Sequence, residues 1–272
     1  RQASLLEKLA LRITPDGKSE QGEISTLDDR LLATPPLALQ QSSTAAVSMA
    51  NCAVNAMKSA MESVWSYAPA LADKIREEEN RTDKYEDILG TYLLKLGALP
   101  LSDAESEEVT ELLKLIGDFE RIGDHAVNVL ESAEELHDKK LDFSESAQHE
   151  MKTMMAALCD VLDTALRSFV NNDVESAKLV EPLEQVIDDL KRELRTRHIQ
   201  RMKKGECSVE AGFVWADLLT NLERASDHCS NVALCVIDMR THDLNLHETL
   251  TLRTHADEFD SLYKQYARKY AL

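Results

Sequence analysis

One short segment occurs twice in this chain, and this duplication constrains the fold more than any other feature of the sequence. The copies are residues 119–129 and 222–232, so they lie 103 positions apart. Glu, Arg, Asp, His, Asn and Val are identical between the copies, which gives six identities in the ten positions from residue 120 to residue 129. Chance does not produce such agreement, so the chain is predicted to consist of two equivalent units of about 100 residues.

Residues that break helices are scarce throughout the chain. Only 8 Gly and 6 Pro are spread over 272 residues, whereas β-sandwiches, barrels and propellers need turn residues roughly every 8–12 positions. Apolar residues recur instead at helical spacing, as Leu112, Ile116 and Phe119 do. The predicted fold class is therefore all-α, with two tandem antiparallel three-helix bundles and an extra C-terminal helix.

Start and stop signals locate these helices. The first bundle is predicted to contain helices at residues 35–66, 69–97 and 102–139, with a capping-box pattern formed by Ser102 and Glu105. In the second bundle the helices are predicted to begin after Ser144, near Asp173 and near Ser208. Pro182 is expected to bend the middle helix of that bundle. A seventh helix is predicted from residue 245 to about residue 270.

This pattern divides the chain into four segments. Residues 1–34 are interpreted as a short helix and a tether, because the helical spacing breaks at a Pro-Asp-Gly sequence that a polar stretch follows. The first repeat is predicted at residues 35–141, the second repeat at 142–243 and the C-terminal helix at 244–272.

Charge and cysteine usage restrict the class of partner and the compartment. The formal net charge is −18. This charge argues against nucleic acid as a partner, because phosphate neutralisation needs a basic surface. It also argues against direct binding to an anionic membrane. No apolar run reaches the roughly 18 residues that a membrane-spanning helix needs. The 5 cysteines form no Cys-x-x-Cys pattern, so free thiols in a reducing compartment are predicted.

Each copy of the duplicated segment presents a glutamate and an aspartate four residues apart. These pairs are Glu120 with Asp124 and Glu223 with Asp227, and residues at i and i+4 share one face of a helix. With 49 acidic residues in the chain, most such pairs belong to solvated surfaces. The repetition with shared flanking residues distinguishes these two pairs.

The preceding helix of each unit repeats the same spacing, with Glu79 and Asp83 in the first and Glu184 and Asp188 in the second. Antiparallel helices pack with their axes about 8–10 Å apart, so two facing pairs can surround one volume with four carboxylates. Such oxygen ligands suit a divalent ion or a small cluster of ions, namely Mg, Mn, Fe or Ca, with Zn as a further option.

These residues carry a resemblance to a known family. The Glu-Arg-Ile-Gly-Asp sequence at 120–124, its echo Glu-Arg-Ala-Ser-Asp at 223–227 and the acidic pair on each preceding helix resemble the PhoU family over about residues 37–240. The resemblance implies two tandem three-helix bundles, multinuclear metal clusters (Fe, Mn, Zn or Mg) and a role in the control of phosphate uptake. It implies two metal sites, which consist of Glu79, Asp83, Glu120 and Asp124, and of Glu184, Asp188, Glu223 and Asp227.

The flanking sequences narrow the resemblance further. Residues 27–35, 197–199, 205–207 and 263–270 are similar to bacterial type II-related sodium/phosphate cotransporters, in which a PhoU-like domain follows the membrane helices. This similarity implies a cytosolic regulatory domain at the inner membrane, whose partner is the transporter portion of the same polypeptide. A free-standing PhoU-like regulator is the alternative. Pro182 lies two residues before Glu184, and the first repeat has no proline at the corresponding position. The two helices that carry the second site are therefore expected to be arranged differently from those of the first.

Two basic residues flank each pair in the duplicated segment. His125 and His228 follow the aspartates by one position, about 100° around the helix, so packing or hydrogen bonding is favoured over direct metal ligation. Arg121 and Arg224 follow the glutamates, and two roles are open to them: pairing with the neighbouring acids, or holding a phosphate at the edge of the metal.

An enzyme and a metal-independent docking protein are the alternatives to a metal-dependent regulator. A di-iron oxidase needs Glu-x-x-His on two helices, and that spacing occurs only at Glu134 with His137. No phosphate-binding P-loop or Gly-x-Ser-x-Gly pattern is present, so the chain is not expected to be an enzyme. A helical bundle that docks another protein without metal is the remaining alternative, and a homo-oligomer is compatible with every one of these interpretations.

Overall fold

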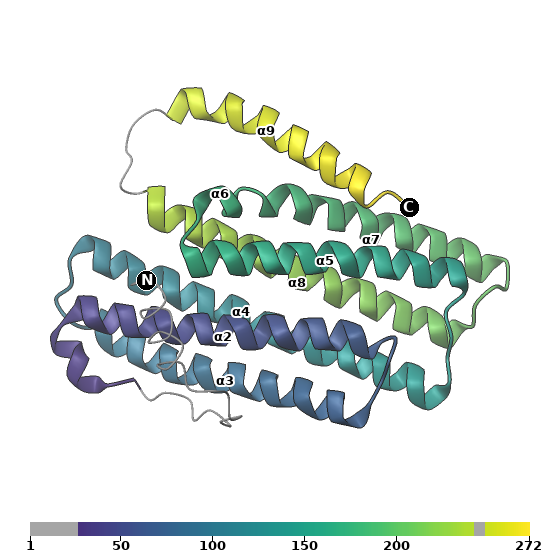
Figure 1. Cartoon of the computed structure of the whole chain (residues 1–272), viewed down its shortest axis with the longest axis horizontal. Coiled ribbons are helices and arrows are strands. Elements are labelled where there is room, and N and C mark those ends of the chain that lie inside the picture. Colours follow the sequence, from purple (N-terminus) through teal and green to yellow (C-terminus); the bar gives the residue numbers. More distant parts are fainter. Residues whose placement is uncertain (1–26, 242–247) are drawn as a thin grey trace, which may run out of the picture.

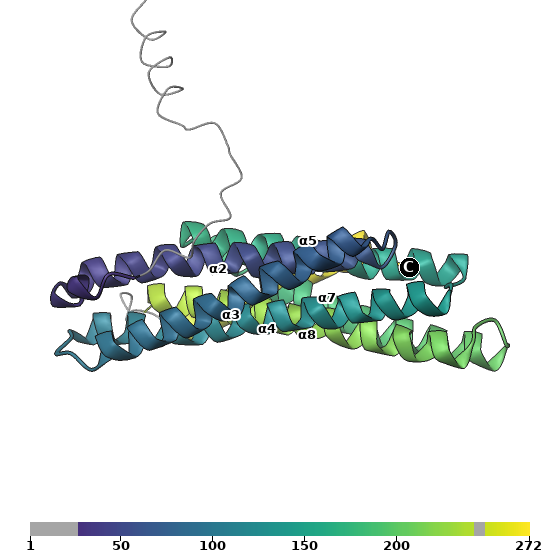
Figure 2. The ribbon, with the colours of Figure 1, turned by 90° about the horizontal axis from the view of Figure 1, so that it is seen from below.

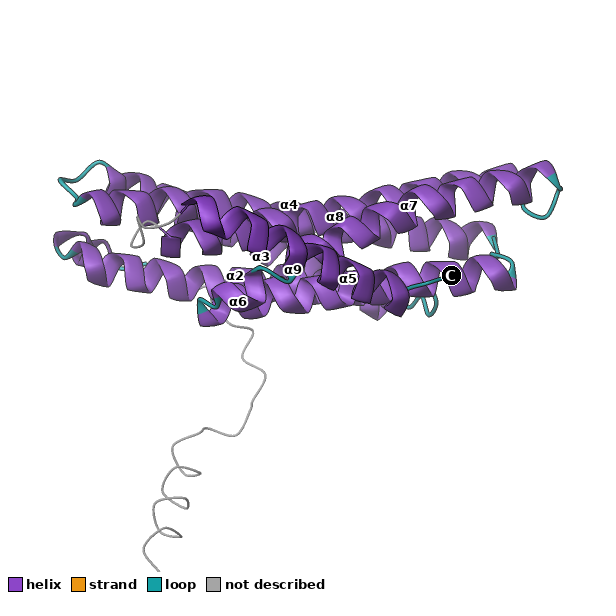
Figure 3. Ribbon diagram, turned by 90° about the horizontal axis from the view of Figure 1, so that it is seen from above, coloured by secondary structure: helices purple, strands orange, loops and turns teal. Residues whose placement is uncertain are grey.

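The structure is a computed structural model that describes residues 27–241 and 248–272, with side chains described for 27–239 and 257–272. These residues form helices and no strand (Figure 3). The elements are η1 (Asp29–Ala33), α2 (Pro35–Ser63), α3 (Pro69–Gly97), α4 (Asp103–Lys139), α5 (Glu145–Asn171), α6 (Val174–Ala177), α7 (Val180–Lys203), α8 (Val209–Thr241) and α9 (Glu248–Lys269). The predicted all-α fold class is confirmed.

The long helices form two three-helix groups that run along an elongated molecule (Figures 1 and 2). Helices α2, α3 and α4 pack together, and helices α5, α7 and α8 form the second group. The groups meet where α4 packs against α8, and α2 also contacts α5. Helix α9 packs against α7, and its end reaches α5, where Lys269 and Tyr270 contact Asp160.

Among the described residues, one hydrophobic core runs through both groups. Small residues line the buried face of α2, where Ala46, Ala50 and Ala53 are fully buried, so its neighbours can approach closely. Larger side chains fill the centre, and the rings of Phe119 on α4 and Phe169 on α5 lie 5.2 Å apart across the boundary between the groups. Because the core is continuous, the two repeats are expected to hold each other in a fixed arrangement.

Most helix ends agree with the signals in the sequence. Ser102 and Glu105 form the capping box at the start of α4, which ends at Lys139 as predicted, and α3 ends at Gly97 as predicted. Helix α2 ends at Ser63 rather than at residue 66. The helix predicted within residues 1–26 and the chain at 242–247 lie outside the described residues.

The second repeat corrects one prediction. The helix expected to start near Asp173 and bend at Pro182 is two helices, because α6 ends at Ala177 and α7 begins at Val180. The proline ring would clash with the carbonyl of residue 178 in a continuous helix. In the structure Pro182 is the third residue of α7, where its missing N–H removes no helical hydrogen bond. The proline therefore separates two helices and bends neither.

None of the described helices combines the length and the apolar run that crossing a bilayer requires.

Candidate metal centres

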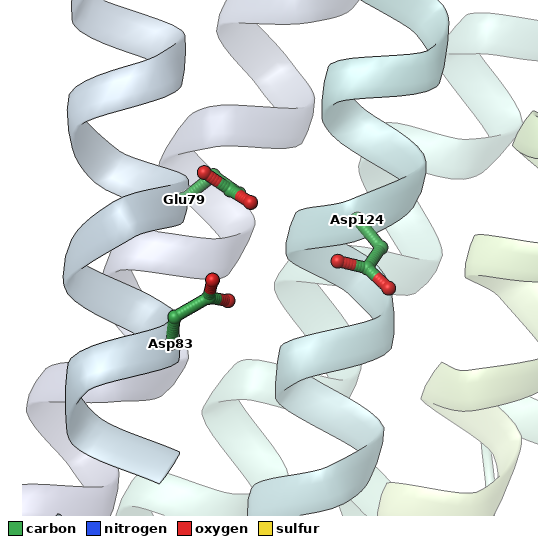
Figure 4. A group of neighbouring side chains, drawn as sticks. All are labelled: Glu79, Asp83 and Asp124. Carbon is green, nitrogen blue, oxygen red and sulfur yellow. The ribbon is translucent and has the colours of Figure 1, made fainter. Parts of the chain in front are cut away.

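Three carboxylates from two helices meet in the first repeat. Glu79 and Asp83 lie one turn apart on α3 and face Asp124 on α4 (Figure 4). One carboxylate oxygen from each residue lies within 4.8 Å of the others. Beside these acids the buried Thr82 on α3 packs against Gly123 on α4, where an added Cβ would lie 3.5 Å from the threonine side chain, an ordinary van der Waals distance.

The second repeat builds an equivalent group. Glu184 and Asp188 on α7 face Asp227 on α8, again with one oxygen of each within 4.8 Å of the others. The positions that correspond to Thr82 and Gly123 are Ile187 and Ser226, and both are fully buried. The altered helix start at Pro182 therefore leaves the geometry of the group intact. We call the two groups, with Glu120 and Glu223 beside them, the first and the second carboxylate cluster.

The fourth predicted member of each cluster lies at its edge. Glu120 interacts with Asp124 but is outside the close set of three in the first repeat. Glu223 forms an ion pair with Lys191, whose Nζ lies 2.6 Å from its Oε1. The other oxygen of Glu223 is buried and takes no hydrogen bond from any described residue. Arg224 Nε lies 3.9 Å from this oxygen, beyond hydrogen-bonding distance, so the oxygen has unused capacity to bind a cation at the edge of the second cluster.

Burial and repulsion by neighbouring carboxylates raise the pKa of three acids in the first cluster, Glu79, Asp83 and Glu120. For Glu79, burial is the larger cause, and the charges of Asp83 and Asp124 add to it. The pKa of Asp83 rises through burial and through the charge of Asp124. Burial, with the charge of Asp124, raises the pKa of Glu120 to about 7. These three carboxylates therefore hold protons more readily than isolated acids do.

The second cluster has the same electrostatic character. Burial raises the pKa of Glu184 to about 8, and the charge of Asp188 is the next cause. The pKa values of Asp188 and Asp227 are also raised, in each case by burial first and by Glu223 second. Groups that repel one another in this way gain stability from any bound cation, whether it is a proton or a metal ion.

The arginines of the duplicated segment lie over the clusters at the surface. Arg121 is 3.2 Å from Asp124 and 3.4 Å from Glu120, and its side chain is 61% exposed. Arg224 lies 3.5 Å from Asp227 and 3.9 Å from Glu223. Of the two predicted roles, pairing with the neighbouring acids is the one that these distances describe.

The histidines join the repeats to each other. His125 Nδ1 on α4 lies 2.9 Å from Asn221 Oδ1 on α8, and His228 Nδ1 on α8 lies 2.9 Å from Asp118 Oδ1 on α4. Asp118 and Asn221 are themselves 103 positions apart, so the two contacts are related by the duplication. The imidazole rings stack with centroids 5.6 Å apart. Neither histidine belongs to a described group that could hold a metal, which agrees with the hydrogen-bonding role favoured from the sequence.

The donor set of both clusters consists of carboxylate oxygens alone among the described residues. Such donors suit hard divalent ions such as Mg²⁺, Mn²⁺ or Ca²⁺, and Fe²⁺, whereas Zn²⁺ sites usually include sulfur or imidazole ligands. The residues present therefore fit a divalent metal. Lys191 is the site residue that the sequence reasoning missed, although comparing positions 105 residues apart would have revealed it.

Comparisons with known proteins agree with this architecture. A family model described as the PhoU domain matches residues 46–133 and again residues 151–236. A protein named phosphate-specific transport system accessory protein PhoU homolog 1, from Thermotoga maritima, is 28% identical over 193 residues, which cover 68% of this chain and 79% of the relative. A PhoU homolog from Deinococcus radiodurans is 24% identical over 164 residues, which cover 60% of this chain and 76% of the relative.

Solved structures are similar in fold. The phosphate transport system regulatory protein PhoU from Streptococcus pneumoniae has a TM-score of 0.68 at 19% identity, and the match covers 79% of this chain and all of that one. PhoU from Pseudomonas aeruginosa has a TM-score of 0.61 at 21% identity, covering 78% of this chain and 97% of the other. The two matched segments of the family model correspond to the two repeats and together span more than half of the sequence. The chain therefore belongs to the PhoU family.

Proposed function

We propose that this chain is a PhoU-type regulator of phosphate transport in which the two carboxylate clusters bind divalent metal ions. The regulatory part rests on the family and on relatives named as phosphate-specific transport accessory proteins. These relatives favour the free-standing regulator over the cotransporter domain expected from the flanking sequences. In this proposal the protein acts in the cytosol on a membrane phosphate transporter, which is its partner.

One observation supports the metal part of the proposal more than any other. Three carboxylates gather within 4.8 Å in each repeat, at positions related by the duplication. Facing acids in a fixed scaffold repel one another, and a structure gains nothing from building that repulsion twice unless a cation balances it. Glu79, Asp83 and Asp124 would hold a metal in the first cluster, with Glu120 beside them. Glu184, Asp188 and Asp227 would do so in the second, with Glu223.

The arginines give the same surface a second capacity. Arg121 and Arg224 are exposed, and each lies over a cluster. A guanidinium beside a bound metal could hold an oxyanion such as inorganic phosphate, because both groups attract it. A regulator must bind its signal more tightly in one state of the assembly than in another. Metal, alone or with phosphate, would supply that difference if it altered how this surface docks on the transporter.

The test pairs metal content with phosphate uptake. Cells that lack the native protein receive the wild type or the variant in which both Asp124 and Asp227 are changed to Asn. The purified proteins are loaded with Mn²⁺, desalted and measured by mass spectrometry. We expect the wild type to retain metal and the variant to lose most of it, and the variant to fail in adjusting phosphate uptake when external phosphate changes.

A matched variant controls for charge. Asp142 and Asp217 are exposed acids outside the clusters, and changing both to Asn removes the same two charges. This control should retain metal and normal uptake. Equal metal content in all three proteins would refute the metal sites, and a helical docking domain that ignores metal would then explain any effect on uptake. Unchanged uptake in a strain without the protein would refute the regulatory role.

A further inference from the structure

The duplication exposes a reversal of charge between the two clusters. Glu79 and Asp83 correspond to Glu184 and Asp188, 105 positions later, so the next turn of α3 corresponds to the next turn of α7. In the first repeat that turn carries Glu86 and Asp87. In the second repeat it carries Lys191 and Arg192. Two acidic residues beside one cluster are therefore replaced by two basic residues beside the other.

In the second cluster the basic residues interact with the acids. Lys191 Nζ lies 2.6 Å from Glu223 Oε1, and the lysine side chain is only 26% exposed. Lys191 also acts electrostatically on both Asp188 and Asp227. Arg192 pairs with Asp189 and adds to the positive field at Asp188. An ammonium group is thus already paired with the carboxylate at the edge of the second cluster.

In the first cluster the corresponding acids add to the negative field. Glu86 acts on Glu120, and Asp87 acts on Asp83. No described basic side chain from the α3 turn that follows Asp83 enters this cluster, and Lys84 and Lys95 on the same helix form no ion pair with its acids. Among the described residues, Glu120 forms its ion pair with Arg121, and Arg81 on α3 pairs with Glu78 outside the cluster, whereas Glu223 pairs with both Lys191 and Arg224.

One difference between the repeats acts in the opposite direction. Glu181, a turn before Glu184, adds an acid to the second cluster, and the hydroxyl of Ser230 donates to it. The corresponding residue of the first repeat is Arg76, which pairs at 2.8 Å with Glu134 rather than with a cluster acid. Arg76 therefore does not neutralise the first cluster in the way that Lys191 neutralises the second.

We propose that the first cluster is the tight cation site and the second the weak one, and that Lys191 sets the difference by holding Glu223. The proposal rests on the metal binding proposed above and goes beyond it. A metal entering the second cluster must displace or tolerate the ammonium group, whereas a metal entering the first meets additional acids. The second cluster would then bind metal only at higher metal concentration. Its occupancy would therefore change when the concentration of available metal changes.

Calorimetric titration of the chelator-stripped full chain with Mn²⁺ tests this order. The Asp227→Asn variant removes a ligand of the second cluster, so its titration measures Mn²⁺ binding at the first cluster. The Asp124→Asn variant removes a ligand of the first cluster, so its titration measures binding at the second. We expect Mn²⁺ to bind the Asp227→Asn protein at least about tenfold more tightly than the Asp124→Asn protein, since a unit charge a few ångströms from a ligand has an effect of that order or larger.

Exchanging the charges should exchange the affinities. In the Asp124→Asn protein, adding Lys191→Gln should tighten Mn²⁺ binding about tenfold, because Glu223 is released and a positive charge is removed. In the Asp227→Asn protein, adding Glu86→Lys should weaken binding by a similar factor. Lys139→Gln and Asp142→Lys make the same charge changes far from both clusters, and neither should alter the affinity by more than about twofold.

The outcomes separate this inference from the function on which it rests. Equal affinities in the two single-cluster proteins, or no response to Lys191→Gln, would overturn the inference while leaving metal binding intact. No heat of binding in the wild type would overturn both. Circular dichroism of each variant verifies that a lost affinity does not come from a lost fold.

Discussion

One ion pair in this protein is almost completely buried. Glu150 on α5 and Arg201 on α7 approach to 2.7 Å, with side chains only 6% and 7% exposed. The guanidinium also lies 5.1 Å from the centre of the Trp215 ring. Two charges removed from water require each other, because neither can be buried alone without a large desolvation cost.

Removing one partner of this pair should destabilise the protein strongly. Changing Glu150 to Ala leaves Arg201 buried without its counter-charge, so we expect the free energy of unfolding to fall by about 3–5 kcal/mol. Urea denaturation followed by circular dichroism measures this change. The control is Glu135→Ala, which breaks the exposed pair with Lys139 and should cost less than about 1 kcal/mol. Equal losses in the two variants would contradict this assignment.

Single residues also show how far the sequence predicts the clusters. The repeated spacing of Glu and Asp identified the three acids that meet in each repeat, because i and i+4 positions share a face and the helices are neighbours. It did not separate Glu120 and Glu223 from those sets. That distinction depends on which neighbour each carboxylate meets across the helix pair, and Lys191, which pairs with Glu223, is not part of the motif.

At the scale of the helix, the sequence predicts where helices begin and end better than it predicts where a helix is interrupted. The capping box at Ser102 is a local interaction between side chains and adjacent backbone groups, so the sequence alone predicts it. The break between α6 and α7 is harder to predict, because a proline such as Pro182 can either bend a continuous helix or begin a new one. Asp173 accepts hydrogen bonds from the backbone of Glu175 and Ser176 and so supports a separate short helix.

Two glycines should respond oppositely to the same substitution. Gly117 lies within α4, and an added Cβ there would meet nothing within 4 Å. Gly117→Ala should therefore stabilise the protein by up to about 1 kcal/mol, because alanine has the higher helix propensity. Gly205 follows α7 with a φ of +72°, and Gly205→Ala should cost about 1 kcal/mol. Thermal unfolding compares them, and shifts of the same sign would contradict this account.

For the whole molecule, the duplication also determines how the two repeats contact each other. Asp118 and Asn221 are equivalent positions, and each meets a histidine of the other repeat at 2.9 Å. The repeats therefore pack through the same surface on both sides, as the two subunits of a symmetric dimer do. The sequence predicted the repeated unit and its helices. It could not predict that α4 and α8 meet at this surface, because their apolar stripes are compatible with several neighbours.

The metal-free protein should become less stable as the pH rises. The pKa values of about 7 for Glu120 and about 8 for Glu184 in the folded state exceed the ordinary value of 4.5, so the folded protein binds more protons than the unfolded chain. The stability contributed by these protons is complete below the unfolded pKa and is lost as the pH rises through the folded values. In EDTA, we expect the melting temperature to fall between pH 7 and pH 8.5.

Metal should reverse this trend, because it takes the place of the protons. Binding requires deprotonated carboxylates, so saturating Mn²⁺ should raise the melting temperature more at pH 8.5 than at pH 7. The chosen range lies above the lowered pKa of His125, which burial keeps neutral, so this imidazole adds no slope of its own. Glu184→Gln cannot titrate and should flatten the decline in EDTA. A melting temperature that rises from pH 7 to pH 8.5 in EDTA would contradict the repulsion on which both clusters depend.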